Sequence, residues 1–501
     1  MKKNLLTKIA KASMIILPCS IFFSYHPLFY FGADSLMHYE LSLALIALVL
    51  FDIIAAIYLI LNRELLKKAP KRFLIVTALF PIYATLSILW SSSKLHGFFA
   101  AGIIWAIYLA IHAYGWVYQD LLKDKKFTSK FIQIFFVVSL IVCAFCWLQC
   151  IVDLLGVGQE ATLMCTGCGY RIFGFPHPNG FMAEPQYLGG VLLAPALLSL
   201  YLLGQEFSKK RLALAFVFAA TIFLSLSRGA IYAFAVASAV LIVATIVKQK
   251  TARALFIIPL LALAFLFTLN AQGLFAQFSR TDDTYTSGIS KVINQLSLGK
   301  IDISAKESDD ANTEESVENE TNKKDPAASP EFEVIAKTEP AETAYYDGYV
   351  EASTNGRTAL FRASVALATA SPHNFLFGVG IGSGGNAIYQ NYIDPGFIDD
   401  AKTRQMIKDA GVDIPSLNVQ SEYAELFLEF GIIGIILIVL VAILCIQSIL
   451  GHKDRIFLLT LAVAYLVAFA FCSGLTNSLY LYLFIPIFYY VLKNYRTKYV
   501  G

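Results

Sequence analysis

Long apolar runs separated by short polar segments dominate the chain. A helix needs roughly 20 apolar residues to cross a bilayer core of about 30 Å, and by this measure we predict twelve membrane-spanning helices. The first run follows a lysine-rich start, as in a signal peptide, but no convincing cleavage site follows it, so we interpret it as a retained helix. The predicted spans are 13–32, 40–62, 73–90, 97–118, 131–152, 187–204, 212–227, 229–247, 255–273, 424–448, 456–475 and 478–493.

The amino-acid composition excludes several other classes of protein. Of the 501 residues, 57% are hydrophobic and 15% are charged, whereas soluble domains have about 45–50% apolar and about 25% charged residues. These values exclude a soluble multidomain enzyme, a nucleic-acid-binding protein, a disordered scaffold and a disulfide-rich secreted module. The expected fold class is an all-α polytopic membrane protein without a nucleic-acid partner.

The positions of Lys and Arg predict the orientation, because cytoplasmic loops carry an excess of both. With the N-terminus inside, the short cytoplasmic segments collect 24 basic residues and the short outer segments hold three, Lys94, Arg171 and Arg228. Both termini are then cytoplasmic. The loops 153–186 and 274–420 then lie on the outer face.

The chain divides into three parts on this basis. Residues 1–273 hold nine predicted helices and the outer loop 153–186, residues 274–420 form one large outer loop, and residues 421–501 hold three helices. The large loop carries 22 acidic and 12 basic residues, a net charge of −10. Its stretch 302–345 has too few large apolar residues to fold alone and is expected to be an acidic linker. The segment 378–386, GVGIGSGGN, is predicted to be a glycine-rich turn.

Three arginines on the outer side depart from the charge pattern that sets the orientation. Arg228 stands between two spans in LSLSRGA, and a planar guanidinium binds phosphate in a bidentate manner. Two interpretations are open for it: an anion clamp at the membrane face, or a side chain that reaches lipid headgroups. Arg171 and Arg357 lie beside Gly- or Pro-rich turns and are either solvated charges or further members of a site for a lipid-linked pyrophosphate.

Acidic and histidine side chains near the same face are candidates for proton transfer. Glu184 ends the proline-rich loop RIFGFPHPNGFMAEP, which also contains His177; Glu184 is either a base or sugar ligand, or a cap of the following helix. Glu422 stands at the outer edge of a span, and Glu429 lies about two turns further in, where it should face the bundle or a wet cavity. His373 is either a proton carrier or a structural residue.

No resident metal or cofactor is expected. Cys165 and Cys168 form a single CxxC in an outer loop, and a zinc site would need two more ligands. A disulfide and free thiols are both open for this pair. The sequence has no nucleotide-binding glycine motif in a strand–helix context.

Four motifs in order resemble the O-antigen polymerase/O-antigen ligase superfamily of bacterial envelope enzymes. They cover about 170–440 and match its Arg–Gly–Phe…Glu–Pro loop, its Ser-x-Ser-Arg-Gly signature, its Arg…Pro…Gly-x-Gly segment and its Tyr…Glu-x-Gly helix entry. They read RIFGFPHPNGFMAEPQYLGG, LSLSRGA, NGRTALFRASVALATASPHNFLFGVGIGS and SEYAELFLEFGIIG.

The resemblance implies a multi-pass enzyme of the bacterial inner membrane with its active site facing the periplasm. Its members transfer oligosaccharide from an undecaprenyl-pyrophosphate carrier to an acceptor glycan, without a cofactor, among membrane lipids and optionally with a chain-length regulator. The resemblance places Arg228 and Arg357 at the donor pyrophosphate, with Arg171 assisting. For the base, Glu184 is preferred, followed by Glu422, with His373 also a candidate.

One departure favours a polymerase over a ligase. Ligases of this family have a His shortly before the Tyr…Glu-x-Gly segment, where this chain has Gln420 and Ser421, and Gln cannot act as a base. The expected function is polymerisation of O-antigen or a related surface polysaccharide. The alternatives are a ligase that transfers the glycan to lipid A-core or to protein, and, from another class, a twelve-span transporter.

Overall fold

The computed structural model describes residues 2–24, 27–31, 39–155, 163–164, 176–247, 251–278, 284–298, 300–301, 342–391, 404, 419, 421–472 and 479–495. This part of the chain is helical apart from one hairpin, in which β1 (Pro27–Phe31) pairs antiparallel with β2 (Tyr39–Ser42). Most of the expected acidic linker, 302–341, lies outside the described residues.

Every predicted span contains a helix in the described residues. Among the described residues, nine helical segments are long and apolar enough to cross a membrane, and α19 and α20 are shorter apolar helices, which confirms the all-α polytopic membrane fold. Helix α10 has 16 residues and is not among these. The helices are α1 (Lys2–Ser20), α2 (Leu43–Leu61), α4 (Lys71–Leu86), α5 (Lys94–His112), α7 (Lys125–Leu154), α9 (Pro185–Gln205), α10 (Lys209–Leu224), α11 (Arg228–Val247), α12 (Thr251–Phe278), α18 (Glu422–Leu450), α19 (Arg455–Ala468) and α20 (Leu479–Asn494).

The first predicted span was placed wrongly. The prediction put it at 13–32, whereas α1 begins at Lys2 and ends at Ser20, and the apolar residues Pro27–Phe31 form β1. A short apolar run does not by itself distinguish strand from helix. The remaining elements are α3 (Glu64–Lys67), α6 (Gln119–Leu122), α13 (Tyr285–Leu296), α14 (Glu342–Thr369), α15 (Pro372–Phe377), α16 (Gly384–Asn391), the 3₁₀ turns η1 (Ile21–Phe23) and η2 (Ser87–Leu89), and the π-helical turn η3 (Ala113–Val117).

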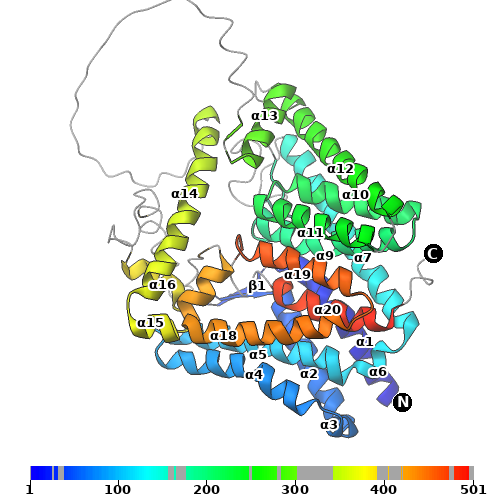
Figure 1. Ribbon diagram of the computed structural model, residues 1–501, viewed down its shortest axis with the longest axis vertical. Coiled ribbons are helices and arrows are strands. Elements are labelled where there is room, and N and C mark those ends of the chain that lie inside the picture. The colour runs from blue at the N-terminus through cyan, green and yellow to red at the C-terminus, as the bar shows by residue number, and fades with distance from the viewer. Residues whose placement is uncertain are drawn as a thin grey trace, which may run out of the picture.

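The long helices lie side by side as a bundle (Figure 1). Helices α14, α15 and α16 lie at one side of the bundle, and the start of α1 and the end of α20 lie toward the opposite side. There α14 runs across the direction of α18, against which it packs. The bundle therefore presents one set of helix ends to α14.

Helix α9 occupies the centre of the bundle, and its most apolar stretch is entirely buried. Glycines allow the close approach of its neighbours, since a Cβ on Gly189 would lie 2.3 Å from the Cβ of Ala230 in α11. At its far end, buried Arg211 donates to the carbonyls of Leu202 (3.2 Å) and Glu206 (2.9 Å). The Leu202 carbonyl also accepts the backbone N–H of Glu206, whereas the Glu206 carbonyl lies past the last turn of the helix. Arg211 thus stabilises the end of α9.

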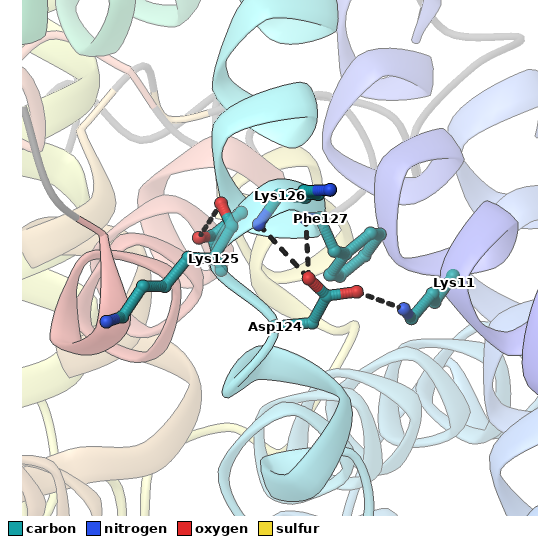
Figure 2. Close-up of polar contacts among 6 residues, drawn as sticks. Lys11, Asp124, Lys125, Lys126 and Phe127 are labelled. Atoms are coloured by element: carbon teal, nitrogen blue, oxygen red, sulfur yellow. Dashed lines mark hydrogen bonds and ion pairs between the residues drawn. The ribbon is translucent and has the colours of Figure 1, made fainter. Parts of the chain in front are cut away.

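A polar contact joins the first helix to α7 (Figure 2). The Nζ of Lys11 lies 2.7 Å from Asp124, and the other carboxylate oxygen of Asp124 accepts from the backbone N–H groups of Lys126 and Phe127 as the N-cap of α7. The hydrogen bond from Lys11 lowers the pKa of Asp124 below 3.8. The contribution of the ion pair is thus fully present at neutral pH and is lost as the pH falls through this lowered pKa.

We predict that Gly189→Val destabilises the protein, because a larger side chain forces α9 and α11 apart at a cost of about 1–3 kcal/mol or more. The measurement is the thermal loss of monodisperse protein in detergent. The control is Gly102→Val, because a Cβ at Gly102 in α5 meets no heavy atom within 4 Å. Equal melting of the two variants would contradict the packing argument.

We predict that Asp124→Asn and Asp124→Ala differ in stability. Asn still caps α7 and loses only the partly exposed ion pair, which contributes about 1 kcal/mol at most. Ala also loses the cap, at an additional cost of about 1 kcal/mol. Melting temperatures at low and high salt measure both effects, and only the ion-pair part should vanish at high salt.

Candidate functional site

The site begins at the first turn of α9. Pro185 occupies the first helical position, where its missing N–H is not needed, and Glu184 precedes it in an extended conformation. Glu184 is the N-cap residue of α9, and its side chain makes no capping hydrogen bond. Burial raises the pKa of Glu184 above its usual 4.5, while the positive charge of Arg357 lowers it.

Arg357 reaches this turn from α14. Its Nη2 donates to Oε1 of the buried Gln186 at 3.1 Å. The helix that carries it is held on α18 by a small apolar core that includes Leu360 and Leu367 of α14 and Leu428 of α18. The contact joins residues 171 positions apart in the chain, so it depends on tertiary packing alone.

Glu422, at the start of α18, lies in the same region as Arg357 and Glu184. It is 3% exposed, and its backbone N–H donates to the carbonyls of Phe469 and Cys472 at 2.8 and 2.9 Å. The hydroxyl of Tyr482 in α20 donates to its carboxylate. Burial raises the pKa of the Cys472 thiol to about 11, and the charges of Arg357, Glu422 and Glu184 also act on this pKa.

Arg228 begins α11 immediately after a tight turn. Leu226 adopts a left-handed backbone conformation (φ 47°) in this turn, and Ser225 Oγ donates to the Ile222 carbonyl at 2.7 Å. The next residue, Gly229, lies so close to Phe471 that an added Cβ would be 2.5 Å from the Phe471 Cβ. Small residues in LSLSRGA thus let Arg228 start its helix against the segment that follows α19.

His177 connects the two arginines electrostatically. Burial is the main cause that lowers the pKa of its imidazole to about 4, and the charges of Arg228 and Arg357 contribute to this lowering. At neutral pH the ring is therefore uncharged. The sequence analysis noted His177 only as part of its loop; prolines on both sides, which restrict its backbone, were the available signal that its position is fixed.

The residues described so far form what we call the helix-end cluster. It lies at the side of the bundle where α14 is located (Figure 1). Arg357 interacts electrostatically with Glu184 and Cys472, and both Arg228 and Arg357 interact electrostatically with His177. In this partly buried setting charge interactions are stronger than in water. The helix-end cluster consists of His177, Glu184, Gln186, Arg228, Arg357, Glu422 and Cys472.

The other predicted site residues are not part of this cluster. His373 is exposed on α15, and its ring packs near Trp90 and Phe377. Arg171 and the CxxC residues Cys165 and Cys168 lie outside the described residues. In the described part of the chain, no group of three or more His, Cys, Asp and Glu side chains is arranged to hold a metal ion.

We predict that Glu184→Gln stabilises the protein at neutral pH. Because burial raises the folded-state pKa above 4.5, ionised Glu184 costs stability, and this cost develops as the pH rises through that pKa. The variant should melt above the wild type at pH 7–8, and the difference should shrink toward pH 4.5. The exposed Glu64→Gln is the control, and a wild-type melting curve for Glu184→Gln at pH 8 would contradict the prediction.

Comparison with known proteins is consistent with this geometry. Residues 213–439 match the model of a family described as O-antigen ligase. The matched region contains Arg228, Arg357 and Glu422, whereas Glu184 precedes it. Comparisons with curated proteins and with solved structures found no match. Residues 213–439 are thus similar to the O-antigen ligase family, and this similarity supports the resemblance to the O-antigen polymerase and ligase superfamily.

Proposed function

We propose that this protein is a glycosyltransferase of the bacterial inner membrane that polymerises undecaprenyl-pyrophosphate-linked repeat units of O-antigen or a related surface polysaccharide. The observation that carries the proposal is that Arg357 lies near Glu184 and Gln186, and that both Arg228 and Arg357 lie near His177, at the ends of membrane helices. A cluster at helix ends suits a substrate whose lipid lies in the bilayer and whose sugars lie in water.

In the proposed mechanism, Arg228 and Arg357 bind the donor pyrophosphate. Guanidinium groups bind phosphate oxygens through paired N–H donors, and Gln186 orients Arg357 through a single hydrogen bond. As the bond between the sugar C1 and the pyrophosphate oxygen breaks, negative charge grows on the leaving group. The two fixed positive charges stabilise that charge. The uncharged His177 between them adds no further charge.

An acceptor sugar hydroxyl attacks C1 and gives up its proton. Glu184 is the preferred base because a carboxylate whose pKa is raised toward neutrality accepts a proton more readily. Glu422 is the second candidate, and the Tyr482 hydroxyl donates a hydrogen bond to its carboxylate. Undecaprenyl pyrophosphate leaves with the electron pair of the broken bond.

The proposed orientation has both termini in the cytoplasm and the helix-end cluster at the periplasmic face. Its support is the excess of Lys and Arg in the segments on the side of the termini and the position of the cluster at the other side (Figure 1). Lipid-linked glycans and membrane lipids are the proposed partners.

A ligase is the second candidate, and the description of the matching family favours it. Against it stands the sequence position that a ligase fills with His, which this chain fills with Gln420, outside the described residues, and Ser421. Ser421 is buried at the start of α18. A hydroxyl has too high a pKa to take over the role of an imidazole base at neutral pH.

We predict that Arg228→Ala and Arg357→Ala each abolish glycan chain growth while the protein still inserts into the membrane. Removal of a charge that stabilises the leaving group costs about 10²–10³-fold in rate. The measurement is the surface-glycan ladder of a deletion strain that expresses each variant. The matched control is Arg362→Ala, at an exposed arginine of the same α14. Wild-type ladders from the first two variants would contradict the binding of the donor pyrophosphate by Arg228 and Arg357.

The same gel distinguishes the two candidate functions. Loss of a polymerase leaves single repeat units attached to the core, whereas loss of a ligase leaves bare core and accumulated lipid-linked chains. The second pattern in the deletion strain would overturn the polymerase assignment and leave the arginine prediction intact.

A further inference from the structure

Helix α18 breaks at Gly431, and the break exposes hydrogen-bond acceptors. Gly431 has φ 58° and ψ −166° inside an otherwise regular helix. The carbonyls that precede such a break lose their partners in the next turn. Those of Leu428, Glu429 and Phe430 are instead used by segments from elsewhere in the chain.

The glycine turn (residues 378–386) supplies most of the donors. The N–H groups of Val379 and Gly380 donate to the carbonyls of Leu428 and Glu429 at 2.9 and 3.0 Å. The approach requires glycine, because a Cβ on Gly378 would lie 2.2 Å from the Glu429 carbonyl oxygen. Tyr83 in α4 completes the set, with its hydroxyl 2.9 Å from the Phe430 carbonyl and 3.0 Å from that of Phe377.

The side chain of Glu429 binds the same turn. It is 8% exposed, and its Oε1 accepts the backbone N–H of Gly384 at 3.1 Å. The backbone N–H groups of Gly382 and Ser383 also interact with this carboxyl group. The expectation that Glu429 faces the bundle or a wet cavity is therefore refined, because its partner is the backbone of the glycine turn.

Serines on the connection between α4 and α5 bind the other side of the turn. Ser91 Oγ lies 2.6 Å from Ser383 Oγ and donates to the Ile381 carbonyl at 3.0 Å. Ser87 Oγ accepts the N–H of Ile381 at 3.1 Å. The turn is thus held between α18 and the α4–α5 connection by hydrogen bonds on both sides.

Two short links connect this turn to Arg357. Helix α15 runs directly into Gly378, and its Asn374 donates from Nδ2 to the Leu367 carbonyl near the end of α14 at 3.1 Å. The apolar core between α14 and α18 contains Leu428, one residue before Glu429. Displacement of the turn would therefore shift the helix that carries Arg357.

We propose that Glu429 is a positioning residue: its carboxylate holds the glycine turn against the broken α18 and thereby sets the place of Arg357 over Glu184. This inference rests on the proposed function for its catalytic readout. It assigns Glu429 no part in proton transfer. A misplacement of about 1 Å at a reacting group costs up to about 10²-fold in rate.

The first experiment compares Glu429→Gln with Glu429→Ala in a transfer assay with a purified lipid-pyrophosphate-linked oligosaccharide. Gln keeps an oxygen that accepts the Gly384 N–H, so its activity should stay within about threefold of wild type, whereas Ala should lose about 10- to 100-fold. The loss should fall mainly on kcat. Equal loss in both variants would overturn the proposal and indicate that the ionisable carboxyl itself is needed.

The second experiment uses a disulfide to hold the glycine turn in place of the hydrogen bond that Glu429→Ala removes. Ser91→Cys with Ser383→Cys places two thiols where the hydroxyl oxygens are 2.6 Å apart, and oxidation of the purified protein should join them. The disulfide should restore most of the activity lost in Glu429→Ala, and reduction should remove it again. Single-cysteine variants are the controls, and a fully formed disulfide without recovery would contradict a positioning role.

The rate at which this disulfide forms can be measured without any enzymatic activity. At a fixed oxidant concentration, the cysteine pair should form more slowly in Glu429→Ala than in Glu429→Gln or the otherwise wild-type chain, because the turn is less firmly held. If the wild type is inactive but the rates follow this order, the proposed function is overturned and the role of Glu429 in holding the glycine turn stands. Equal rates in all three backgrounds would overturn that role.

Discussion

The hydrogen-bonding requirement of the backbone in a membrane governs this structure. Inside hydrocarbon, each N–H and C=O must find a partner within the protein, and an unbroken helix supplies all of them. Polar chemistry is then confined to places where helices begin, end or break. The start of α9 beside Glu184, the start of α11 at Arg228 and the break of α18 at Gly431 are three such places, and the conspicuous polar side chains of the chain gather at them.

The central helix links these places. Because α9 is buried along its whole apolar stretch, the position of its first turn is set by neighbours on every side rather than by its own loop. Gln186 on that turn orients Arg357, and the carboxylate of Glu184 shares its surroundings with Glu422. The cluster is therefore preorganised by helix packing, which is the condition for charges to act without reorganisation during a reaction.

Much of the fold could be predicted because each membrane helix corresponds to a continuous apolar run in the sequence. Apolar runs located the long apolar helices but not the polar helix α14. At 13–32 the bounds were wrong because Pro27–Phe31 is as apolar as a helix but pairs as a strand. The site could be predicted only as a set of residue types. The contact of Arg357 with Gln186 and the burial of His177 between two arginines come from packing between distant segments, and no local pattern encodes them. Likewise, Glu184 is the N-cap residue of α9 without a side-chain capping hydrogen bond, and its proximity to Arg357 also comes from packing between distant segments.

The break at Gly431 also determines how deep α18 lies in the bilayer. Beyond the break, residues 432–450 form a regular helix of about 28 Å at about 1.5 Å per residue, which matches a hydrocarbon thickness of about 30 Å. The preceding turns, with Glu422, Glu425 and Glu429, then fall in the headgroup region. A continuous helix over the same residues would be about 43 Å long and would have to tilt or drag carboxylates into hydrocarbon. The kink thus allows the acidic end of α18 to stay level with the polar surface of the membrane.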